Sequence, residues 1–175
     1  MVSALRPNLV LLVGVNHAHQ YVNHPESATA KFSCYLEKIC RARSVDLIAE
    51  EMNEDALQVN RTDSTARRLS CKLGTAHVLC DPNESERQAL GIPSYEQLKQ
   101  KHGFGKYLVD EQIKTIEQAE QSFWPIREAE WLRRLGRFES VNCLFILGSN
   151  HASSLSRLLA KQTIRNELLC TRWEP

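Results

Sequence analysis

Two stretches that lie far apart in the chain share one pattern, and this repeat constrains the fold more than any other feature of the sequence. Residues 11–19 have the sequence LLVGVNHAH, and residues 145–152 have the sequence FILGSNHA. Each stretch is an apolar run followed by Gly-x-Asn-His-Ala. An apolar run that ends at a glycine is typical of a strand buried on both faces of a parallel sheet. His17 and His151 therefore follow the ends of two predicted strands.

The repeat also predicts that the two histidines meet. In an open parallel sheet the carboxyl ends of the strands lie along one edge, and ligands bind in the crevice there. His17 and His151 can converge at that edge although the chain between them is long. An alternative interpretation is that Asn-His is simply favourable turn chemistry after a strand. The same residues at the same spacing in both copies favour a shared site.

Apolar runs and helical periodicity alternate along the rest of the chain. We expect strands at residues 10–13, 45–49, 76–80, 141–147 and 167–171, with helices between them. This alternation predicts a single α/β domain over residues 1–175. The domain has three layers, with a mostly parallel central sheet and helices on both of its faces. Residues 91–136 are helical and contain no predicted strand, so we interpret them as a lid-like insert over the sheet edge.

Acidic residues follow two further predicted strands. Glu50 and Glu51 come directly after the second strand, and Asp81 follows the third. Because strand side chains alternate in direction, one of Glu50 and Glu51 faces the crevice, and a register shift of one residue exchanges them. A solvated loop would also explain the paired acids, and Asp81 would also suit the cap of the next helix. His19, which follows the first strand, is a further candidate for the site.

One helix of the insert carries two charged residues that would suit the same site. Arg127 and Glu128 are adjacent on the helix that starts at Pro125. An arginine near a strand-end crevice can bind a carboxylate or a developing oxyanion, and Glu128 would add another carboxylate. The alternative is that both residues belong to a solvent-exposed face with surface ion pairs.

Composition and charge argue against several kinds of binding partner. Charged residues are 25% and hydrophobic residues 42% of the 175 residues, as in ordinary soluble globular domains. The formal net charge of +1 gives no general attraction to nucleic acid, so we expect no nucleic-acid partner. No apolar run approaches the roughly 20 residues of a membrane span, and the N-terminal run is too short for a signal peptide. We therefore expect no membrane partner and a cytoplasmic protein, in which the six cysteines are reduced.

The residue types collected at the predicted edge suit metal chemistry. Two imidazoles with one or two carboxylates form a donor set for a divalent transition metal such as manganese, cobalt or zinc. A metal with an open coordination position lowers the pKa of bound water and polarises a carbonyl group. A carboxylate that does not bind the metal could then act as the general base.

These motifs resemble the TraB/Tiki/erythromycin-esterase/ChaN superfamily. The matching pieces follow in order along nearly the whole chain: Gly14-Val15-Asn16-His17, Glu51 in Ala49-Glu50-Glu51-Met52, Arg127 in Ile126-Arg127-Glu128, and Gly148-Ser149-Asn150-His151. The resemblance implies an α/β fold with both histidines and the acids in one site. It also implies a hydrolytic activity, because some members are manganese- or cobalt-dependent peptidases and others are esterases.

The leading hypothesis from the sequence is a metal-dependent hydrolase that acts on an amide or ester bond of a small molecule or peptide. In it, His17, Glu51 and His151 hold the metal, and Glu50 is a spare ligand or the base. Arg127 binds the substrate carboxylate or the oxyanion. One alternative is a metal-free esterase-like site with a histidine as general base. The other is a non-catalytic protein that binds a small anionic ligand, haem or a partner in the same crevice.

Overall fold

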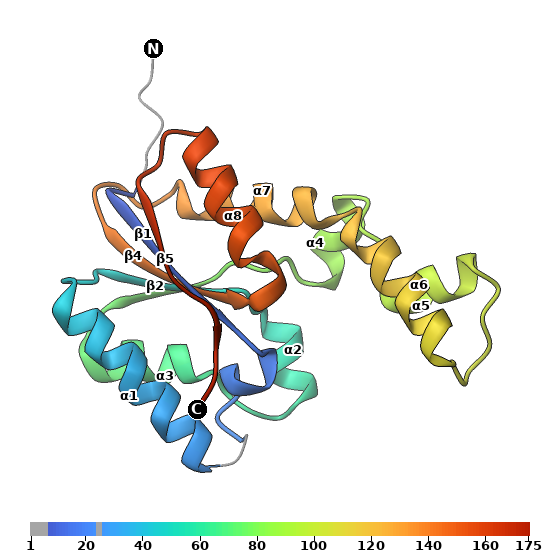
Figure 1. Ribbon diagram of the computed structural model, residues 1–175, viewed down its shortest axis with the longest axis horizontal. Coiled ribbons are helices and arrows are strands. Elements are labelled where there is room, and N and C mark those ends of the chain that lie inside the picture. The colour runs from blue at the N-terminus through green and yellow to red at the C-terminus, as the bar shows by residue number, and fades with distance from the viewer. Residues whose placement is uncertain (1–6, 24–25) are drawn as a thin grey trace.

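The structure, a computed structural model, describes residues 7–23 and 26–175. Within those residues the chain forms a five-stranded sheet in which all paired strands run parallel, in the order β3-β2-β4-β1-β5 (Figure 1). The strands are β1 (Leu9–Val15), β2 (Leu47–Glu50), β3 (Ala76–Leu79), β4 (Asn142–Gly148) and β5 (Asn166–Trp173). β1 and β4 carry the two copies of the repeat and are direct neighbours, so the two copies end side by side.

Helices connect these strands, as the alternation of the sequence predicts. They are η1 (a 3-10 helix, His17–Gln20), α1 (Glu26–Ala42), α2 (Glu54–Val59), α3 (Thr65–Leu73), α4 (Glu84–Ala89), α5 (Tyr95–Lys101), α6 (Asp110–Gln121), α7 (Trp124–Leu135) and α8 (Ser149–Lys161). Two of them, α2 and α3, lie between β2 and β3. None of the helices described is long and apolar enough to cross a membrane.

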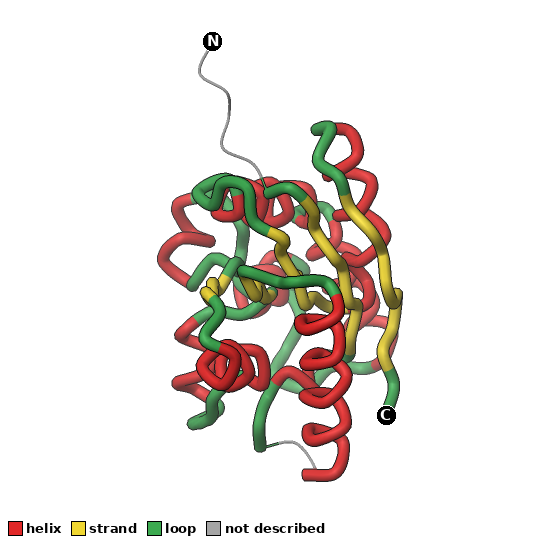
Figure 2. Tube along the Cα trace, turned by 90° about the vertical axis from the view of Figure 1, so that its left-hand side faces the viewer, coloured by secondary structure: helices red, strands yellow, loops and turns green. Residues whose placement is uncertain are grey.

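Alternating residues of β1 contribute to two cores, one on each face of the sheet. Leu11 of β1 packs in one core with Phe32 of α1 and Leu69 of α3. Leu12, which points to the opposite face, packs in the other core with Trp131 of α7. This alternation is the normal consequence of strand geometry. Figure 2 shows helices on both faces of the sheet. The predicted three-layer α/β fold is therefore confirmed.

The helical region predicted as one insert divides into two parts. α7 belongs to the body, because its side chains at Trp131 and Leu135 are 0% and 1% exposed against the sheet. α5 and α6 instead project away from the sheet as a helical hairpin (Figure 1). We call residues 95–121 the arm. The arm is narrower than the predicted insert because the apolar stripe of α7 covers one face of the sheet.

Gly14 marks a close approach between two strands. The sequence suggested that the strand ends at Gly14, but β1 continues through this residue to Val15. A Cβ atom at Gly14 would lie 2.0 Å from the carbonyl oxygen of Thr171 in β5 and 3.1 Å from Cβ of Ala152 in α8. Backbone occupies the space that any side chain would need. Glycine is therefore required at this position for packing, and not for an unusual backbone angle.

We predict that Gly14→Ala destabilises the protein by about 1–3 kcal/mol, because β5 must move to make room for the methyl group. The measurement is the free energy of unfolding from urea titration. Gly105→Ala is the matched control, since no atom lies within 4 Å of the Cβ position there. Equal losses of stability in the two variants would contradict the close approach of β1 and β5.

Candidate functional site

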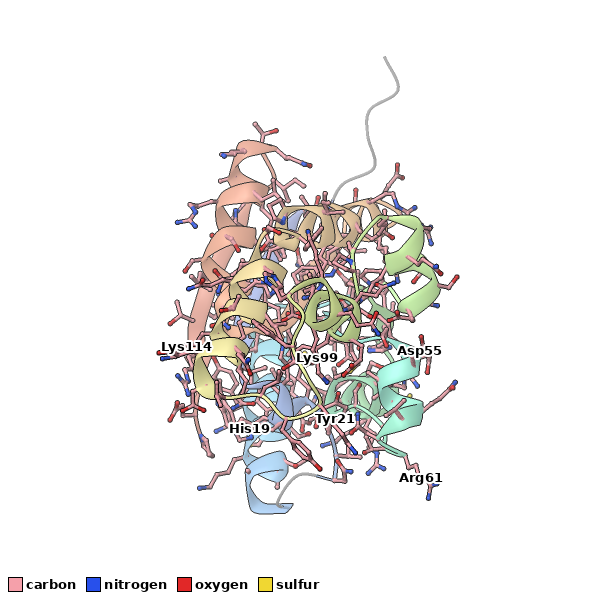
Figure 3. All side chains as sticks on the ribbon, turned by 90° about the vertical axis from the view of Figure 1, so that its right-hand side faces the viewer. His19, Tyr21, Asp55, Arg61, Lys99 and Lys114 are labelled. Carbon is pink, nitrogen blue, oxygen red and sulfur yellow. The ribbon has the colours of Figure 1, made fainter. Side chains whose placement is uncertain are left out.

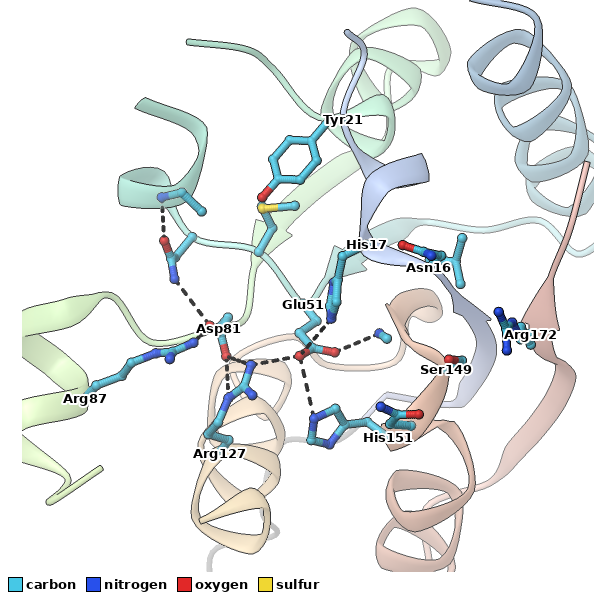
Figure 4. Close-up of a pocket in the computed structure, with 16 residues that line it drawn as sticks. Asn16, His17, Tyr21, Glu51, Asp81, Arg87, Arg127, Ser149, His151 and Arg172 are labelled. Atoms are coloured by element: carbon cyan, nitrogen blue, oxygen red, sulfur yellow. Dashed lines mark hydrogen bonds and ion pairs between the residues drawn. The ribbon is translucent and has the colours of Figure 1, made fainter. Parts of the chain in front are cut away.

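A pocket of about 510 Å³ opens where β1, β2 and β4 end (Figure 4). It lies at the edge of the sheet at which the sequence predicted the site. Five of the residues proposed from the sequence line it: His17, Glu51, Asp81, Arg127 and His151. The side chains of Glu50, Glu128 and His19 do not line it.

Glu51 lies at the centre of the pocket and is 3% exposed. Its Oε1 atom accepts a hydrogen bond from Nη2 of Arg127 at 2.8 Å. Its Oε2 atom accepts one from the backbone N–H of Gly148 at 2.7 Å, at the start of α8. The positive end of the α8 dipole further favours a carboxylate at this point. Glu51 is thus held in place through both of its oxygens.

The two histidines of the repeat, one from each copy of the motif, both lie near Glu51. Nε2 of His17 and Nε2 of His151 each lie 3.7 Å from Oε1 of Glu51. Both distances are too long for a hydrogen bond but short enough for strong attraction between a carboxylate and a protonated imidazole. The predicted convergence of His17 and His151 is therefore present in the structure.

The two copies of the motif differ in backbone and in exposure. After β1 the chain enters η1, where the side chain of Asn16 accepts a hydrogen bond from the N–H of Ala18. The side chain of His17 is 52% exposed there. After β4 the chain enters α8 directly, and the side chain of His151 is 4% exposed. One histidine therefore faces solvent at the pocket mouth, and the other is enclosed by protein.

Glu50 lies outside the pocket, which corrects its predicted role as a ligand or base. It points to the same face of the sheet as Ile48, on the side of α1 and α3, because side chains alternate along β2. There it is fully buried, and its Oε1 atom accepts a hydrogen bond from Oγ of Ser64 at 2.5 Å. The same oxygen lies 2.7 Å from Nε2 of His77. Glu50 thus joins β2 to α3 and β3.

Asp81 belongs to the site and does not cap a helix. The cap of α4 is Asn83, which forms a capping box with Glu86. Oδ1 of Asp81 accepts hydrogen bonds from Nη2 of Arg127 at 2.7 Å and from Nε1 of Trp131 at 3.3 Å. Its other oxygen pairs with Arg87. Burial alone would raise the pKa of Asp81, but Arg127 and Arg87 outweigh it and hold this pKa below its ordinary value.

Glu128 lies behind His151 rather than in the pocket. Its Oε1 atom is 2.9 Å from Nδ1 of His151, and the hydroxyl of Ser154 donates to the same oxygen at 2.5 Å. Two indole rings flank the imidazole, with ring centroids 4.4 Å away for Trp124 and 5.0 Å away for Trp131. The orientation of the imidazole is therefore fixed from several directions. The sequence predicted the carboxylate of Glu128 in the crevice itself, whereas in the structure it contacts His151 and does not line the pocket.

His19 is placed elsewhere. Its ring packs edge-on against Trp173 of β5, with the centroids 5.3 Å apart. His17 lines the pocket and His19 does not, so the structure does not bring both histidines of this segment into one site. His19 therefore contributes to the packing of η1 against the sheet edge and is removed from the set of site residues.

Some residues that contact Asp81 or His151 had no assigned role in the sequence analysis, among them Arg87, Trp124, Trp131 and Ser154. Two of them could have been found from their spacing. Ser154 follows His151 by three residues, and Trp131 follows Arg127 by four, so each pair shares a helix face. Arg87 and Trp124 carried no such signal, because their contacts depend on how α4 and α7 pack.

The arrangement does not fit the metal centre predicted from the sequence. An ion held by His17, His151 and Glu51 would have to bind Oε1 of Glu51, which already accepts a hydrogen bond from Arg127. A guanidinium and a divalent cation would compete for that oxygen, and the other oxygen is bonded to Gly148. Across residues 7–23 and 26–175, no three His, Cys, Asp or Glu side chains form a group that could hold a metal ion. The metal stays a prediction from the sequence.

Comparison with known proteins adds no family assignment. The chain matches no protein-family model, no curated protein and no solved structure. What can be concluded about the site therefore comes from its geometry and from the motifs of the sequence.

We predict that Arg127→Met destabilises the protein by about 3–5 kcal/mol at pH 7, because Asp81 and Glu51 are left buried without their shared partner. The depressed pKa of Asp81 means that the wild type gains stability above the ordinary aspartate pKa of about 3.9 and loses it as pH falls through the folded-state pKa. In the variant the carboxylate can take up a proton at higher pH. The difference in the free energy of unfolding between the wild type and Arg127→Met should therefore become smaller as the pH is lowered from 7 to 4.5. Urea titrations at several pH values measure it.

Arg133→Met is the control for this experiment, because Arg133 lies on the same helix and its side chain is 57% exposed. Its ion pair with Glu130 should contribute less than about 1 kcal/mol. If Arg127→Met were no more destabilising than Arg133→Met at pH 7, the buried ion pairs would not have the structural role described.

Proposed function

We propose that the chain is a hydrolase that cleaves an ester or amide bond of a small molecule or peptide in this pocket, with His151 as the general base. The observation that carries the proposal is the contact between Nδ1 of His151 and the buried carboxylate of Glu128. Because a carboxylate only accepts hydrogen bonds, Nδ1 of the neutral imidazole carries the proton. Nε2, on the side of Glu51 and the pocket, is then free to accept one.

The reaction that this arrangement supports begins with a water molecule between His151 and the substrate carbonyl. Nε2 of His151 takes a proton from the water, whose oxygen forms a bond to the carbonyl carbon. The tetrahedral intermediate then breaks its bond to the alcohol or amine, which leaves with a proton. His17 lies on the other side of Glu51 and is placed to supply that proton at the pocket mouth.

Glu51 supports both proton transfers through its charge. Its carboxylate is 3.7 Å from each Nε2 atom, so it stabilises the imidazolium that forms on His151. Arg127 acts on Glu51 and Asp81 together and is a positioning residue in this proposal. This role replaces the substrate clamp predicted from the sequence, because the guanidinium is already bonded to two carboxylates.

A reducing compartment such as the cytoplasm is part of the proposal. All six cysteines lie in the described residues and are free. Burial raises the pKa of Cys40 to about 11, so this thiol stays protonated and unreactive at neutral pH. The pocket itself contains no cysteine, and the hydrolysis proposed does not need a thiol.

We predict that His151→Gln lowers kcat for the hydrolysis of activated esters about 10²–10⁴-fold, as expected for loss of a general base. Glu128→Gln should lower it about 10–100-fold, because the imidazole loses the partner that fixes its proton on Nδ1. His102→Gln is the control, since His102 is exposed on the arm. Unchanged hydrolysis in a folded His151→Gln protein would refute the proposal, and circular dichroism would verify the fold.

The role of a metal is tested by elemental analysis of the wild type beside a His17→Ala/His151→Ala double variant. We expect hydrolysis to persist in excess chelator, since no step above needs a metal. A near-stoichiometric metal that is lost in the double variant, with activity that chelator abolishes and manganese, cobalt or zinc restores, would contradict this. It would instead support the metal-dependent hydrolase predicted from the sequence.

A further inference from the structure

The arm has little of the support that the other helices receive from the sheet. α5 and α6 pack against each other, with Leu98 and Ile116 buried between them at 2% and 0% exposure. The hairpin projects from the body, and its far end is the loop between the two helices (Figure 1). Figure 3 views the molecule from the side of the arm, with Lys99 on α5 and Lys114 on α6. The tip of the arm can therefore touch a flat surface before the body does.

The composition of the tip differs from that of the rest of the arm. Residues 97–109 have the sequence QLKQKHGFGKYLV, with three lysines, one histidine and no carboxylate. We call these residues the tip segment. Lys101 and Lys106 are exposed, whereas the side chain of Lys99 is 12% exposed and pairs with Glu96. Tyr107 and Val109 are 87% and 62% exposed, although both are large and largely apolar. Nothing lies within 4 Å of the Cβ positions of Gly103 and Gly105, so the loop around Phe104 is open on its outer side.

Exposed apolar side chains beside lysines are the chemistry of a membrane interface. Tyrosine places its ring at the level of the lipid headgroups, and a short aliphatic side chain can enter the boundary with the acyl chains. Lysine keeps its ammonium group among the phosphates while its methylene groups cover apolar surface. Tyr107 and Val109 follow Lys106 in the loop, and Lys101 is the last residue of α5. The loop therefore carries both the apolar side chains and the lysines that such an interface needs.

We propose that the tip segment attaches the protein peripherally to a membrane surface that contains anionic lipid. This departs from the sequence-based expectation of no membrane partner, which rested on the lack of a spanning segment. Peripheral attachment needs no spanning helix, so it is compatible with the helices described above. Single-stranded nucleic acid would also use lysines and an aromatic ring, but it would gain nothing from Leu108 and Val109. The apolar content of the loop therefore favours lipid. Asp110 and Glu111 follow in the first turn of α6, and their carboxylates would oppose insertion of the chain beyond Val109.

The test is sedimentation of the full chain with vesicles of phosphatidylcholine alone or with 30% phosphatidylserine, about 30 mol% being a typical anionic content. We expect the wild type to bind the anionic vesicles and to bind the neutral ones at least about tenfold more weakly. Tyr107→Ser/Val109→Ser should lower binding to the anionic vesicles about tenfold or more, since it removes the apolar contacts. Lys101→Glu/Lys106→Glu should lower it about tenfold and reduce its sensitivity to salt.

Two control variants change residues of the same types elsewhere on the surface. Val59→Ser alters a valine of α2 that is 81% exposed, and Lys161→Glu alters an exposed lysine of α8. Both should bind anionic vesicles like the wild type. The proposal is overturned if the wild type binds no vesicles, if the tip variants bind as well as the controls, or if the tip binds single-stranded RNA and not lipid. Because every substituted side chain is exposed, loss of folding is not expected to explain a change.

Discussion

The buried ion pairs among Arg127, Asp81 and Glu51 are the interaction on which the rest of the site depends. Each carboxylate is less than 5% exposed, and a buried charge without a partner is too costly to keep ionised. One guanidinium satisfies both acids, and Arg87 adds a second cation on Asp81. These contacts fix the end of β2, the end of β3 and the start of α7 relative to one another. The pocket exists because these three segments cannot separate without leaving charges unpaired.

Glu50 and Glu51, the adjacent acids at the end of β2, have different surroundings because side chains alternate in direction along a strand. Glu51 faces the pocket, and Glu50 is buried on the other face with Ser64 and His77. Burial, with a smaller contribution from the charge of Glu50, raises the pKa of Tyr21, a residue of the pocket wall. The second carboxylate is therefore not a spare copy of the first. It ties the strand to the helix layer behind it, so Glu51 projects from a well-supported position.

Much of this could be predicted from the sequence, and the remainder depended on long-range packing. The apolar runs and glycines were sufficient for the parallel sheet, and the repeated motif was sufficient for the meeting of His17 and His151. The choice between Glu50 and Glu51 could not be predicted. It depends on a single-residue register that Ser64 and His77 fix from distant segments. The layer position of α7 was also missed, since an apolar stripe does not show which surface it covers. Glu128 was predicted as a site residue, but its contact with His151 depends on how α7 packs against α8 and could not be predicted.

The order of the strands has a consequence for how the molecule is built. β1 is the first strand of the chain, yet its two neighbours in the sheet are β4 and β5. It cannot pair with β4 until the chain as far as Gly148 is available, or with β5 until Trp173 is available, while β2 and β3 can pair with each other much earlier. Long-range pairing of this kind slows folding and leaves an apolar strand exposed to unwanted contacts. His17 and His151 come together only when β1 has paired with β4, so a chain without this long-range pairing has no assembled site.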